Sequence, residues 1–479
     1  MLFNSFPFFL FLPTVFLLYW FAFKGSLKKQ NLLLLVSSYF FYGWWSWQFM
    51  CLLALSTFLD YMYGFSVVST DRRKAKLFLW LSVINNLGIL GVFKYYNFFA
   101  AQISAGLAAL GLHVTPVLLD VALPVGISFY TFHGMSYVFD IYRGKQEPVR
   151  NFVEYAVFVA FFPLLVAGPI ERANHLLPQV QTTRAFDRVR AIQGCRLILW
   201  GLFKKVVIAD NIADYVNDVF TNYPEYNGIT IVSGAVAFAF QIYGDFSGYS
   251  DVAIGTAKLF GFELLSNFRF PYFSRDVAEF WRRWHISLSS WFRDYLYIPL
   301  GGSRNGKGRA VVNTFIIFLV SGFWHGAKWT FIVWGLIHAV GFIPLLVTGR
   351  NRNNLHSVTA HGRLLPGVKD MFQMLGTFLF VTLAWIFFRA ESVAKAWDML
   401  RRTVTSTGPI TNHIIVRSKP VFYLIALLLV IDWRFRHDER DLRMTGNKFV
   451  NRLLYWIAAT FILFNMINSE HQQFIYFQF

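Results

Sequence analysis

Long runs of apolar residues recur along this chain, and they restrict its fold more than any other feature. Several approach the roughly 20 residues that an α-helix needs to cross a bilayer. The runs are Phe8–Phe23, Leu32–Leu59, Leu77–Val92, Phe152–Gly168, Ile192–Ala209, Ile229–Tyr243, Val311–Phe323, Thr330–Val347, Met371–Phe388, Val421–Ile431 and Leu453–Met466. Because backbone groups inside lipid must be satisfied within the protein, and because these runs lack the alternation of barrel strands, they predict membrane-spanning helices.

Only 15% of the 479 residues are charged, whereas a soluble domain has about 25%. We therefore expect an all-α polytopic membrane protein with about eleven crossings, plus re-entrant or interfacial helices. No Pro-, Gly- or Ser-rich linker and no internal repeat divides the sequence. A single integral membrane domain over residues 1–479 is therefore expected, and the absence of a repeat argues against a transporter built from inverted halves.

The formal net charge of +18 sits in short loops between the runs, where Lys and Arg mark the cytoplasmic side. These loops include Lys24–Lys29, Arg72–Lys76, Arg143–Arg150, Arg304–Arg309, Arg350–Arg352 and Arg434–Arg452. This placement puts the N-terminus outside, and it indicates contact with anionic lipids rather than nucleic acid. Cys51 and Cys195 lie in apolar segments without metal-binding spacing, so neither a disulfide nor a metal site is expected.

The stretch Gly244–Asp251 directly follows an apolar run and carries two carboxylates, Asp245 and Asp251, with Ser247 between them. Carboxylates at membrane depth are costly unless they are paired or face water. The residues therefore leave two interpretations open: a polar turn with solvated aspartates, or a buried site.

The stretch Glu279–Tyr295 is rich in Trp and Arg. Helical spacing would place four residues on one face: Trp281, Trp284, His285 and Leu288. Trp and Arg together are typical of an interfacial helix at the level of the lipid headgroups. Such a helix explains the aromatic residues and the arginines, but not His285. Ser289 lies one helical turn beyond His285 and is a candidate partner for it.

A second histidine, His325, ends the apolar run Val311–Phe323 within Ser321–Ala327. A lone histidine in a membrane helix usually serves as a hydrogen-bonding group between helices. Histidine is also the side chain whose pKa suits proton transfer near neutral pH, and ionisable groups at membrane depth mark functional sites. The glycines on either side would let a substrate or a helix approach closely. His338 and His133 are expected to be structural.

Taken together, these stretches resemble the membrane-bound O-acyltransferase (MBOAT) family, in particular its bacterial alginate O-acetyltransferase branch. The resemblance rests on ordered motifs between about residue 123 and residue 326, within a core region at 123–340. The motifs are Leu123–Phe132, Ser136–Val138, Asp140–Arg143, Phe162-Pro163, Ala167–Ile170, Asp245–Asp251, Phe280–Ser289, Asp294–Gly302 and Trp324–Gly326.

The resemblance implies a ring of tilted helices around a central funnel, with histidine at its narrow point. It implies that His325 is catalytic and that His285 is a second functional position. The expected reaction moves acetyl from cytoplasmic acetyl-CoA, which is a substrate and not a bound cofactor, to a polysaccharide outside the bacterial inner membrane. Alginate and peptidoglycan are among the polymers that the family serves.

Further site residues are expected on the same basis. Asp245, Ser247 and Trp324 would contact substrate, and Arg282 and Arg283 would attract the phosphates of the donor. A periplasmic or extracellular acetyltransferase is the expected partner that completes the transfer. The alternatives are a transporter or flippase for a glycan, and a scaffold without activity that recruits the periplasmic enzyme.

The last stretch, Phe474–Phe479, is aromatic, and its default interpretation is a belt at the membrane interface. It also resembles the C-terminal motif of the small partner subunit in teichoic-acid D-alanylation, in which a tyrosine is proposed to carry the acyl group. That resemblance makes Tyr476 a candidate acetyl carrier, whose phenol is a better leaving group than a sugar hydroxyl.

Overall fold

Helices account for every regular element that the computed structural model describes, and it describes residues 1–166, 168–355, 357–410, 412–440, 442–468 and 474–475. This confirms the expected all-α class. Each helix satisfies its own backbone hydrogen bonds, which is the condition for crossing a bilayer.

Seven helical segments in the described residues are long and apolar enough to cross a membrane: Trp47–Ser66, Arg72–Ala109, Gly228–Leu259, Trp329–Val347, Val368–Arg389, Asn412–Phe435 and Lys448–Asn468. Two shorter apolar segments, Phe6–Ala22 and Phe152–Leu165, also match expected runs. The multi-pass character is therefore confirmed. Some expected runs are divided: Leu32–Leu59 contains the end of one helix and the start of the next.

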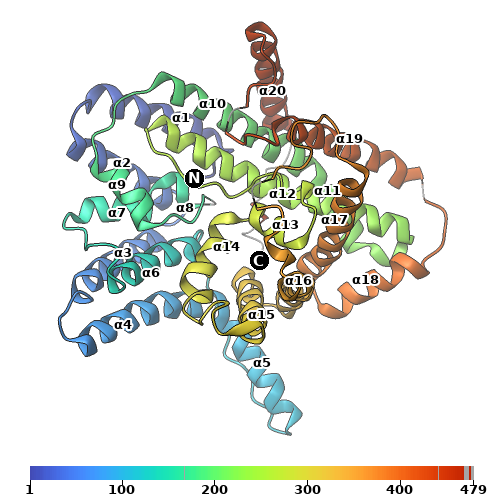
Figure 1. Cartoon of the computed structure of the whole chain (residues 1–479), viewed down its shortest axis with the longest axis horizontal. Coiled ribbons are helices and arrows are strands. Elements are labelled where there is room, and N and C mark those ends of the chain that lie inside the picture. The colour runs from blue at the N-terminus through green and yellow to red at the C-terminus, as the bar shows by residue number, and fades with distance from the viewer. Residues whose placement is uncertain (167, 356, 411, 441, 469–473, 476–479) are drawn as a thin grey trace. The chain divides into compact units, whose positions relative to one another are not determined.

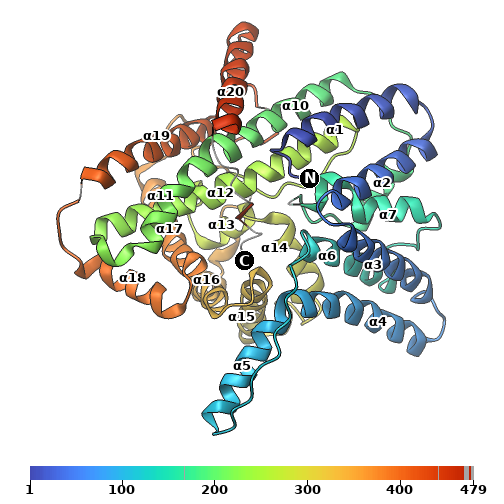
Figure 2. The same ribbon diagram turned by 180° about the vertical axis from the view of Figure 1, so that it is seen from behind.

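The chain forms two compact units, one of which consists of Met1–Cys195 with Ala253–Leu265. Its helices are α1 (Phe6–Leu17), α2 (Leu27–Gly43), α3 (Trp47–Ser66), α4 (Arg72–Leu90), α5 (Tyr96–Ala109), α6 (Ile127–Tyr142), α7 (Phe152–Ala160), α8 (Phe162–Leu165) and α9 (Ala173–Gln181), with the π-helical turns η1 (Leu18–Ala22) and η2 (Gly91–Tyr95). Helices α3, α4 and α6 pack together, as Figures 1 and 2 show.

A buried carboxylate joins these three helices. Asp60 on α3 accepts hydrogen bonds from Ser82 Oγ at 2.7 Å and Asn86 Nδ2 at 2.9 Å, both on α4. Gly134 on α6 lies so close that a Cβ there would be 2.1 Å from Asp60 Oδ2. His133, beside it, is buried and accepts the Glu171 N–H at 3.0 Å, which agrees with its expected structural role.

The second unit consists of Arg196–Val252 and Ser266–Phe479, and α10 (Arg188–Leu202) and α12 (Gly228–Leu259) each continue from one unit into the other. Its α-helices are α11 (Asp210–Thr221), α13 (Val277–Arg283), α14 (Ile286–Phe292), α15 (Gly306–His325), α16 (Trp329–Val347), α17 (Val368–Arg389), α18 (Val393–Thr405), α19 (Asn412–Phe435) and α20 (Lys448–Asn468). Its shorter turns are η3 (Phe203–Ala209), η4 (Tyr223–Glu225), η5 (Pro271–Phe273), η6 (Arg293–Tyr297) and η7 (Arg350–Arg352).

Helices α15 and α16 pack closely along their length and position the end of α15 (Figure 1). A Cβ on Gly322 of α15 would lie 2.2 Å from the carbonyl oxygen of Phe331, and a Cβ on Gly335 of α16 would lie 2.3 Å from that of Phe318. Only glycine fits at both positions, as in other membrane helix pairs that pack through small residues. Gly322, three residues before His325, therefore serves the packing of α15 against α16.

Candidate active site

His285 lies at a break between two short helices, and not within one continuous helix. Helix α13 ends at Arg283 and α14 begins at Ile286, and His285 between them has a φ of 42°. This left-handed conformation is rare for residues other than glycine and costs on the order of 1–3 kcal/mol. The expectation of one helical face for Trp281, Trp284 and His285 is therefore wrong.

Hydrogen bonds to Asn267 hold this turn in place. Its carbonyl oxygen accepts the Ile286 N–H at 2.9 Å, and its side-chain oxygen accepts from Ser287 Oγ at 2.6 Å. Ser289 meets His285 through the backbone, since its N–H donates to the His285 carbonyl oxygen at 3.0 Å. The orientation of the His285 side chain is thus set by this strained turn between α13 and α14.

His325 is the last residue of α15, and its ring centroid lies 6.4 Å from that of His285. The Trp324 ring lies beside both, at 4.9 Å from His325 and 5.9 Å from His285. Both imidazoles are buried, His285 completely and His325 with 3% of its surface exposed. Two histidines that are 40 residues apart in the sequence therefore share one site.

Aromatic rings surround the two imidazoles. His325 meets Trp334 and Phe388 at centroid distances of 5.1 and 5.4 Å, and His285 meets Phe246 at 4.7 Å. Burial in these apolar surroundings lowers the pKa of His285 to about 3, because the charged form is poorly solvated there. His285 is therefore neutral at pH 7. His338 lies nearby and accepts the Trp281 indole N–H at 3.2 Å, which supports its expected structural role.

The two aspartates of Gly244–Asp251 lie inside α12, where each forms an ion pair with a lysine of η3. Lys205 Nζ lies 2.7 Å from Asp245 Oδ1, and Lys204 Nζ lies 2.7 Å from Asp251 Oδ2. Ser247 Oγ accepts from Lys204 Nζ at 2.8 Å. The interpretation of this stretch as a polar turn with solvated aspartates is therefore wrong, since ion pairs within the protein make these charges tolerable at membrane depth.

The lysines were missed by the sequence analysis, although a signal was present. Lys204 and Lys205 interrupt the apolar run Ile192–Ala209, and two charges in such a run require partners. The next apolar run, Ile229–Tyr243, is directly followed by the two carboxylates of Gly244–Asp251. Opposite charges at similar depth would have predicted the pairing.

The end of the chain reaches this region. Phe474 is completely buried, with its ring 4.6 Å from Tyr249 and 5.9 Å from Phe246, the residue that contacts His285. The N–H of Ile475 donates to Asp245 Oδ2 at 2.6 Å. Tyr476 lies outside the described residues.

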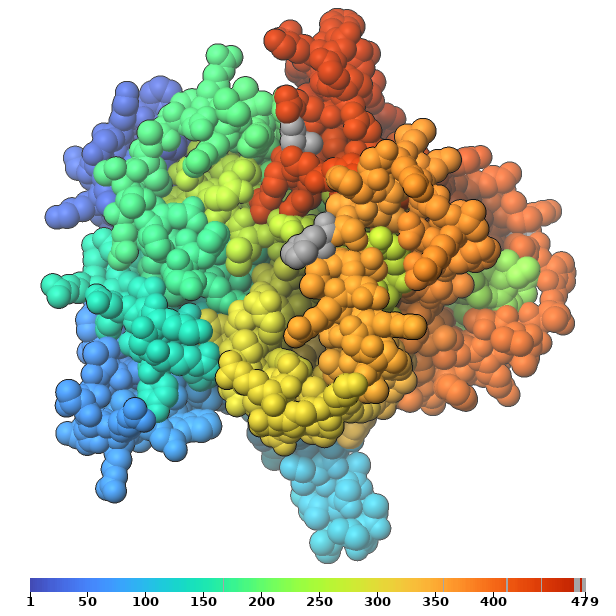
Figure 3. Space-filling view, viewed as in Figure 1, coloured from blue at the N-terminus to red at the C-terminus, as the bar shows by residue number. Residues whose placement is uncertain are grey.

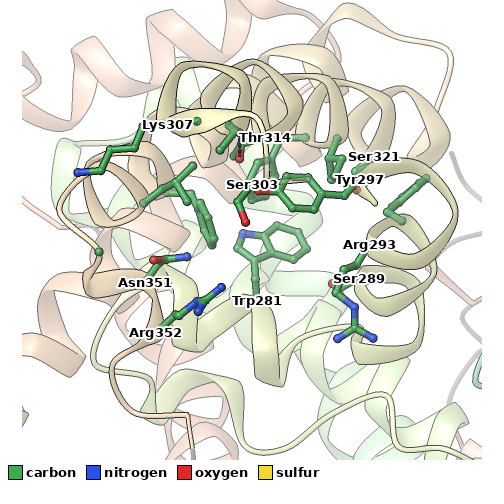
Figure 4. Close-up of a pocket in the computed structure, with 18 residues that line it drawn as sticks. Trp281, Ser289, Arg293, Tyr297, Ser303, Lys307, Thr314, Ser321, Asn351 and Arg352 are labelled. Carbon is green, nitrogen blue, oxygen red and sulfur yellow. Dashed lines mark hydrogen bonds between the residues drawn. The ribbon is translucent and has the colours of Figure 1, made fainter. Parts of the chain in front are cut away.

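A cavity of about 620 Å³ lies among α13, α14, α15 and α16, and neither site histidine is among the residues that line it. Ser289 of α14 and Ser321 of α15 are in its wall, each one helical turn from a site histidine, and Trp281 lies in its centre (Figure 4). Trp281 also contacts Trp334 at a centroid distance of 5.7 Å, so the cavity wall continues into the aromatic rings around His325.

The outer part of this cavity is basic. Arg293, Lys307 and Arg352 line it, together with Asn351, as Figure 4 shows. Residues 303–309 are exposed, and the yellow atoms of this part of the chain lie at the surface in Figure 3. The cavity therefore joins a cationic rim to an apolar interior.

Arg282 and Arg283 do not line the cavity. Arg282 donates to the carbonyl oxygens of Asn351 and Asn353, each at 2.8 Å. Arg283 forms an ion pair with Glu279 at 2.8 Å. Arg282 therefore holds the segment that supplies Asn351 and Arg352 to the cavity, and supports the basic rim without lining it.

Comparisons with known proteins agree with this geometry. The chain matches the model of the membrane-bound O-acyltransferase family over residues 32–386. A Pseudomonas putida protein named "Probable alginate O-acetylase AlgI" is 42% identical over 394 residues, which cover 82% of this chain and 77% of that protein. The peptidoglycan O-acetyltransferase of Helicobacter pylori is 31% identical over 529 residues, covering 100% of this chain and 98% of that enzyme. The teichoic acid D-alanyltransferase of Bacillus subtilis is 29% identical over 231 residues, covering 45% and 57% of the two chains.

The matched range contains both site histidines, the paired aspartates of α12 and the cavity. It also extends well beyond the motifs at 123–326 that carried the resemblance in the sequence. An enzyme, rather than a transporter, follows from the family. With this match and the membrane-spanning helices together, the chain belongs to the membrane-bound O-acyltransferase family and is a multi-pass membrane acyltransferase.

Proposed function

We propose that this protein transfers acetyl from cytoplasmic acetyl-CoA toward a polysaccharide on the outer side of a bacterial inner membrane. The observation that carries the proposal is that two residues of the cavity wall lie close in the chain to the histidine pair. Ser289 and Ser321 line the cavity and sit one turn from His285 and His325. A thioester that enters the cavity would present its carbonyl to the two imidazoles.

The charge of the rim suits the donor. Acetyl-CoA has phosphates at one end and a thioester at the other, joined by a long, mostly neutral arm. Lys307 and Arg352 belong to loops that the distribution of basic residues predicts to be cytoplasmic. Phosphates would be held at this rim by charge-assisted hydrogen bonds, while the arm lies along Trp281.

The histidines supply the proton chemistry. A neutral His325 accepts the proton of the acceptor hydroxyl as its oxygen attacks the thioester carbon. The C–O bond forms, the C–S bond breaks, and the proton passes to the departing thiolate of CoA. His285 orients the reactants or donates to the oxyanion, and the aromatic rings exclude water that would hydrolyse the thioester.

For the acceptor, we take the polymers named for the relatives as the guide. One is an alginate O-acetylase by name and another a peptidoglycan O-acetyltransferase. An extracytoplasmic polysaccharide of this kind is the proposed final acceptor, and a periplasmic or extracellular acetyltransferase is the proposed partner. The site contributes Trp324 beside both histidines, where a sugar ring or an aromatic carrier would stack.

Tyr476 is the proposed first acceptor. It follows Ile475 in the sequence, and the N–H of Ile475 is bound to Asp245. Transfer to its phenol would release CoA and form an acetyl-tyrosine ester. With a pKa near 10, the phenol is a good leaving group, so onward transfer to a sugar hydroxyl remains favourable.

The experiment uses purified protein with acetyl-CoA labelled in the acetyl group. Wild type should release CoA and pass label to its own chain or to added partner and polymer, and His325→Ala should do neither while still inserting in the membrane. Full acetylation by His325→Ala would instead support a scaffold that recruits another enzyme. Transport of a glycan without label transfer would support the transporter.

The carrier step has its own test. Tyr476→Phe keeps the ring and its hydrophobicity but removes the oxygen that would hold acetyl. Loss of labelled protein and of polymer acetylation is expected in this variant. Acetylation of polymer at the wild-type rate would show that residue 476 is only an anchor.

A further inference from the structure

The chain end is held at the site by its backbone. Asp245 has two carboxylate oxygens, and each has a different partner: Oδ1 lies 2.7 Å from Lys205 Nζ, and Oδ2 accepts the Ile475 N–H at 2.6 Å. Asp245 is 3% exposed, and Ile475 is 2% exposed. Asp245 was expected to contact substrate, and in the structure both of its oxygens bind the protein's own chain.

The charges around Asp245 favour such a contact. Lys205 also forms an ion pair with Asp210 at 2.7 Å, so one ammonium group is shared by two carboxylates. The excess negative charge is buried, where it gains most from further N–H donors. The Ile475 N–H is a donor of this kind.

The side chain before Ile475 completes the contact. The Phe474 ring packs against Tyr249, one helical turn after Asp245 on α12, and against Phe246. Phe246 in turn packs against His285 at 4.7 Å. An aromatic ring and a backbone N–H in adjacent residues fix both the position and the register of this segment.

From this arrangement we infer that Asp245, held by Lys205, is a positioning residue that seats the segment Phe474-Ile475 beside the catalytic histidines. We call Asp245, Lys205, Phe246 and Tyr249 the tail seat. The seat recognises residue 475 by its backbone and residue 474 by its ring. As far as it concerns catalysis, the inference rests on the proposed function, because the seat would set which residue of the chain end meets His325.

A labelling experiment tests the seat without measuring catalysis. In the full chain, Cys51 and Cys195 are replaced by Ser, and Ile475→Cys provides one thiol while keeping the backbone N–H. Buried Cys at 475 should react slowly with a maleimide. Asp245→Ala should accelerate labelling by about 10- to 100-fold, the effect of losing a hydrogen bond to a buried charged group.

The chain provides a matched control in the neighbouring pair. Asp251 lies on the same helix and pairs with Lys204 at the same distance of 2.7 Å, yet the chain end makes no hydrogen bond to it in the described residues. Asp251→Ala should leave the labelling rate at 475 unchanged. An unchanged rate in Asp245→Ala, or equal acceleration in both variants, would overturn the inference.

A reciprocal change on the chain end separates positioning from general stability. Ile475→Pro removes the N–H that Asp245 accepts, whereas Ile475→Val retains it. Label transfer from acetyl-CoA should fall about 10-fold or more in Ile475→Pro and in Asp245→Ala, and the fall should be in kcat. The KM for acetyl-CoA should stay unchanged, because no residue of the tail seat lines the cavity. A rise in KM instead of a fall in kcat would contradict the positioning role. If wild type transfers no label while the labelling rates behave as stated, the seat stands and the proposed function fails.

Discussion

The close packing of α15 and α16 allows a quantitative prediction for Gly322→Ala. A Cβ at residue 322 would lie 2.2 Å from the Phe331 carbonyl oxygen, and ordinary contact begins at 3.4 Å. The two helices must therefore separate by about 1.2 Å, the difference of these distances. Overpacking of this kind typically costs about 1–3 kcal/mol.

Activity should respond more strongly than stability. His325 follows Gly322 by three residues and ends the same helix, so a shift of α15 displaces the imidazole from the thioester. A displacement of about 1 Å can lower the rate about 100-fold. We therefore expect Gly322→Ala to remain folded, with a lower thermal midpoint and about 1% of wild-type acetyl transfer.

Gly308→Ala is the matched control, because Gly308 is on the same helix and a Cβ there would meet nothing within 4 Å. Both substitutions gain helix propensity, worth roughly 0.5–1 kcal/mol, so the difference between them isolates the close contact. Acetyl transfer and thermal unfolding in detergent measure the two effects. Wild-type activity and midpoint in Gly322→Ala would refute the argument that this contact positions His325.

Three further outcomes are expected. Lys307→Ala and Arg352→Ala should each raise the KM for acetyl-CoA several-fold at constant kcat, and the effect should be smaller at high salt. The exposed control Lys369→Ala should leave the KM unchanged. Unchanged KM values in the two rim variants would show that the rim does not bind the donor. The pKa of His285 is about 3 in the folded protein and about 6.5 in an unfolded chain. Between these values the unfolded state binds more protons, so stability should fall as the pH drops through this range. His285→Gln should reduce that fall, and a pH dependence identical to that of the wild type would contradict the burial of a neutral imidazole. Ser26→Cys, in a background without the two native cysteines, should react with an impermeant maleimide only after the membrane is permeabilised, and labelling of intact cells would reverse the orientation taken from the basic loops.

The class of the protein could be predicted from its sequence because bilayer physics acts on composition. Runs such as Thr330–Val347 and Met371–Phe388 became the spans of α16 and α17 with small shifts at their ends. The pairing of His285 with His325 was predictable only through family motifs. Apolar periodicity alone gives no reason for two histidines 40 residues apart to meet.

The break at His285 was not predictable from local pattern. The spacing of Trp281, Trp284 and Leu288 suits one helix, and the stretch contains no Gly or Pro that would break it. The break depends on Asn267, which is distant in sequence and binds the backbone of Ile286. Tertiary hydrogen bonds overrode local preference here, and such overrides tend to occur at functional sites.

The strained turn and the glycine contact have complementary effects on the histidine pair. His285 enters the site from a turn whose direction is fixed by Asn267, and His325 enters from a helix end whose depth is fixed by Gly322 against α16. Neither imidazole depends on a flexible loop for its position, so both can be held at a ring separation of 6.4 Å before substrate binds. A site of this kind needs little reorganisation during acyl transfer, because its buried imidazoles and the aromatic rings around them are already in place. Under the proposed function, the acetyl donor and the acceptor would move, and the histidine pair between them would fix where the acetyl group is transferred.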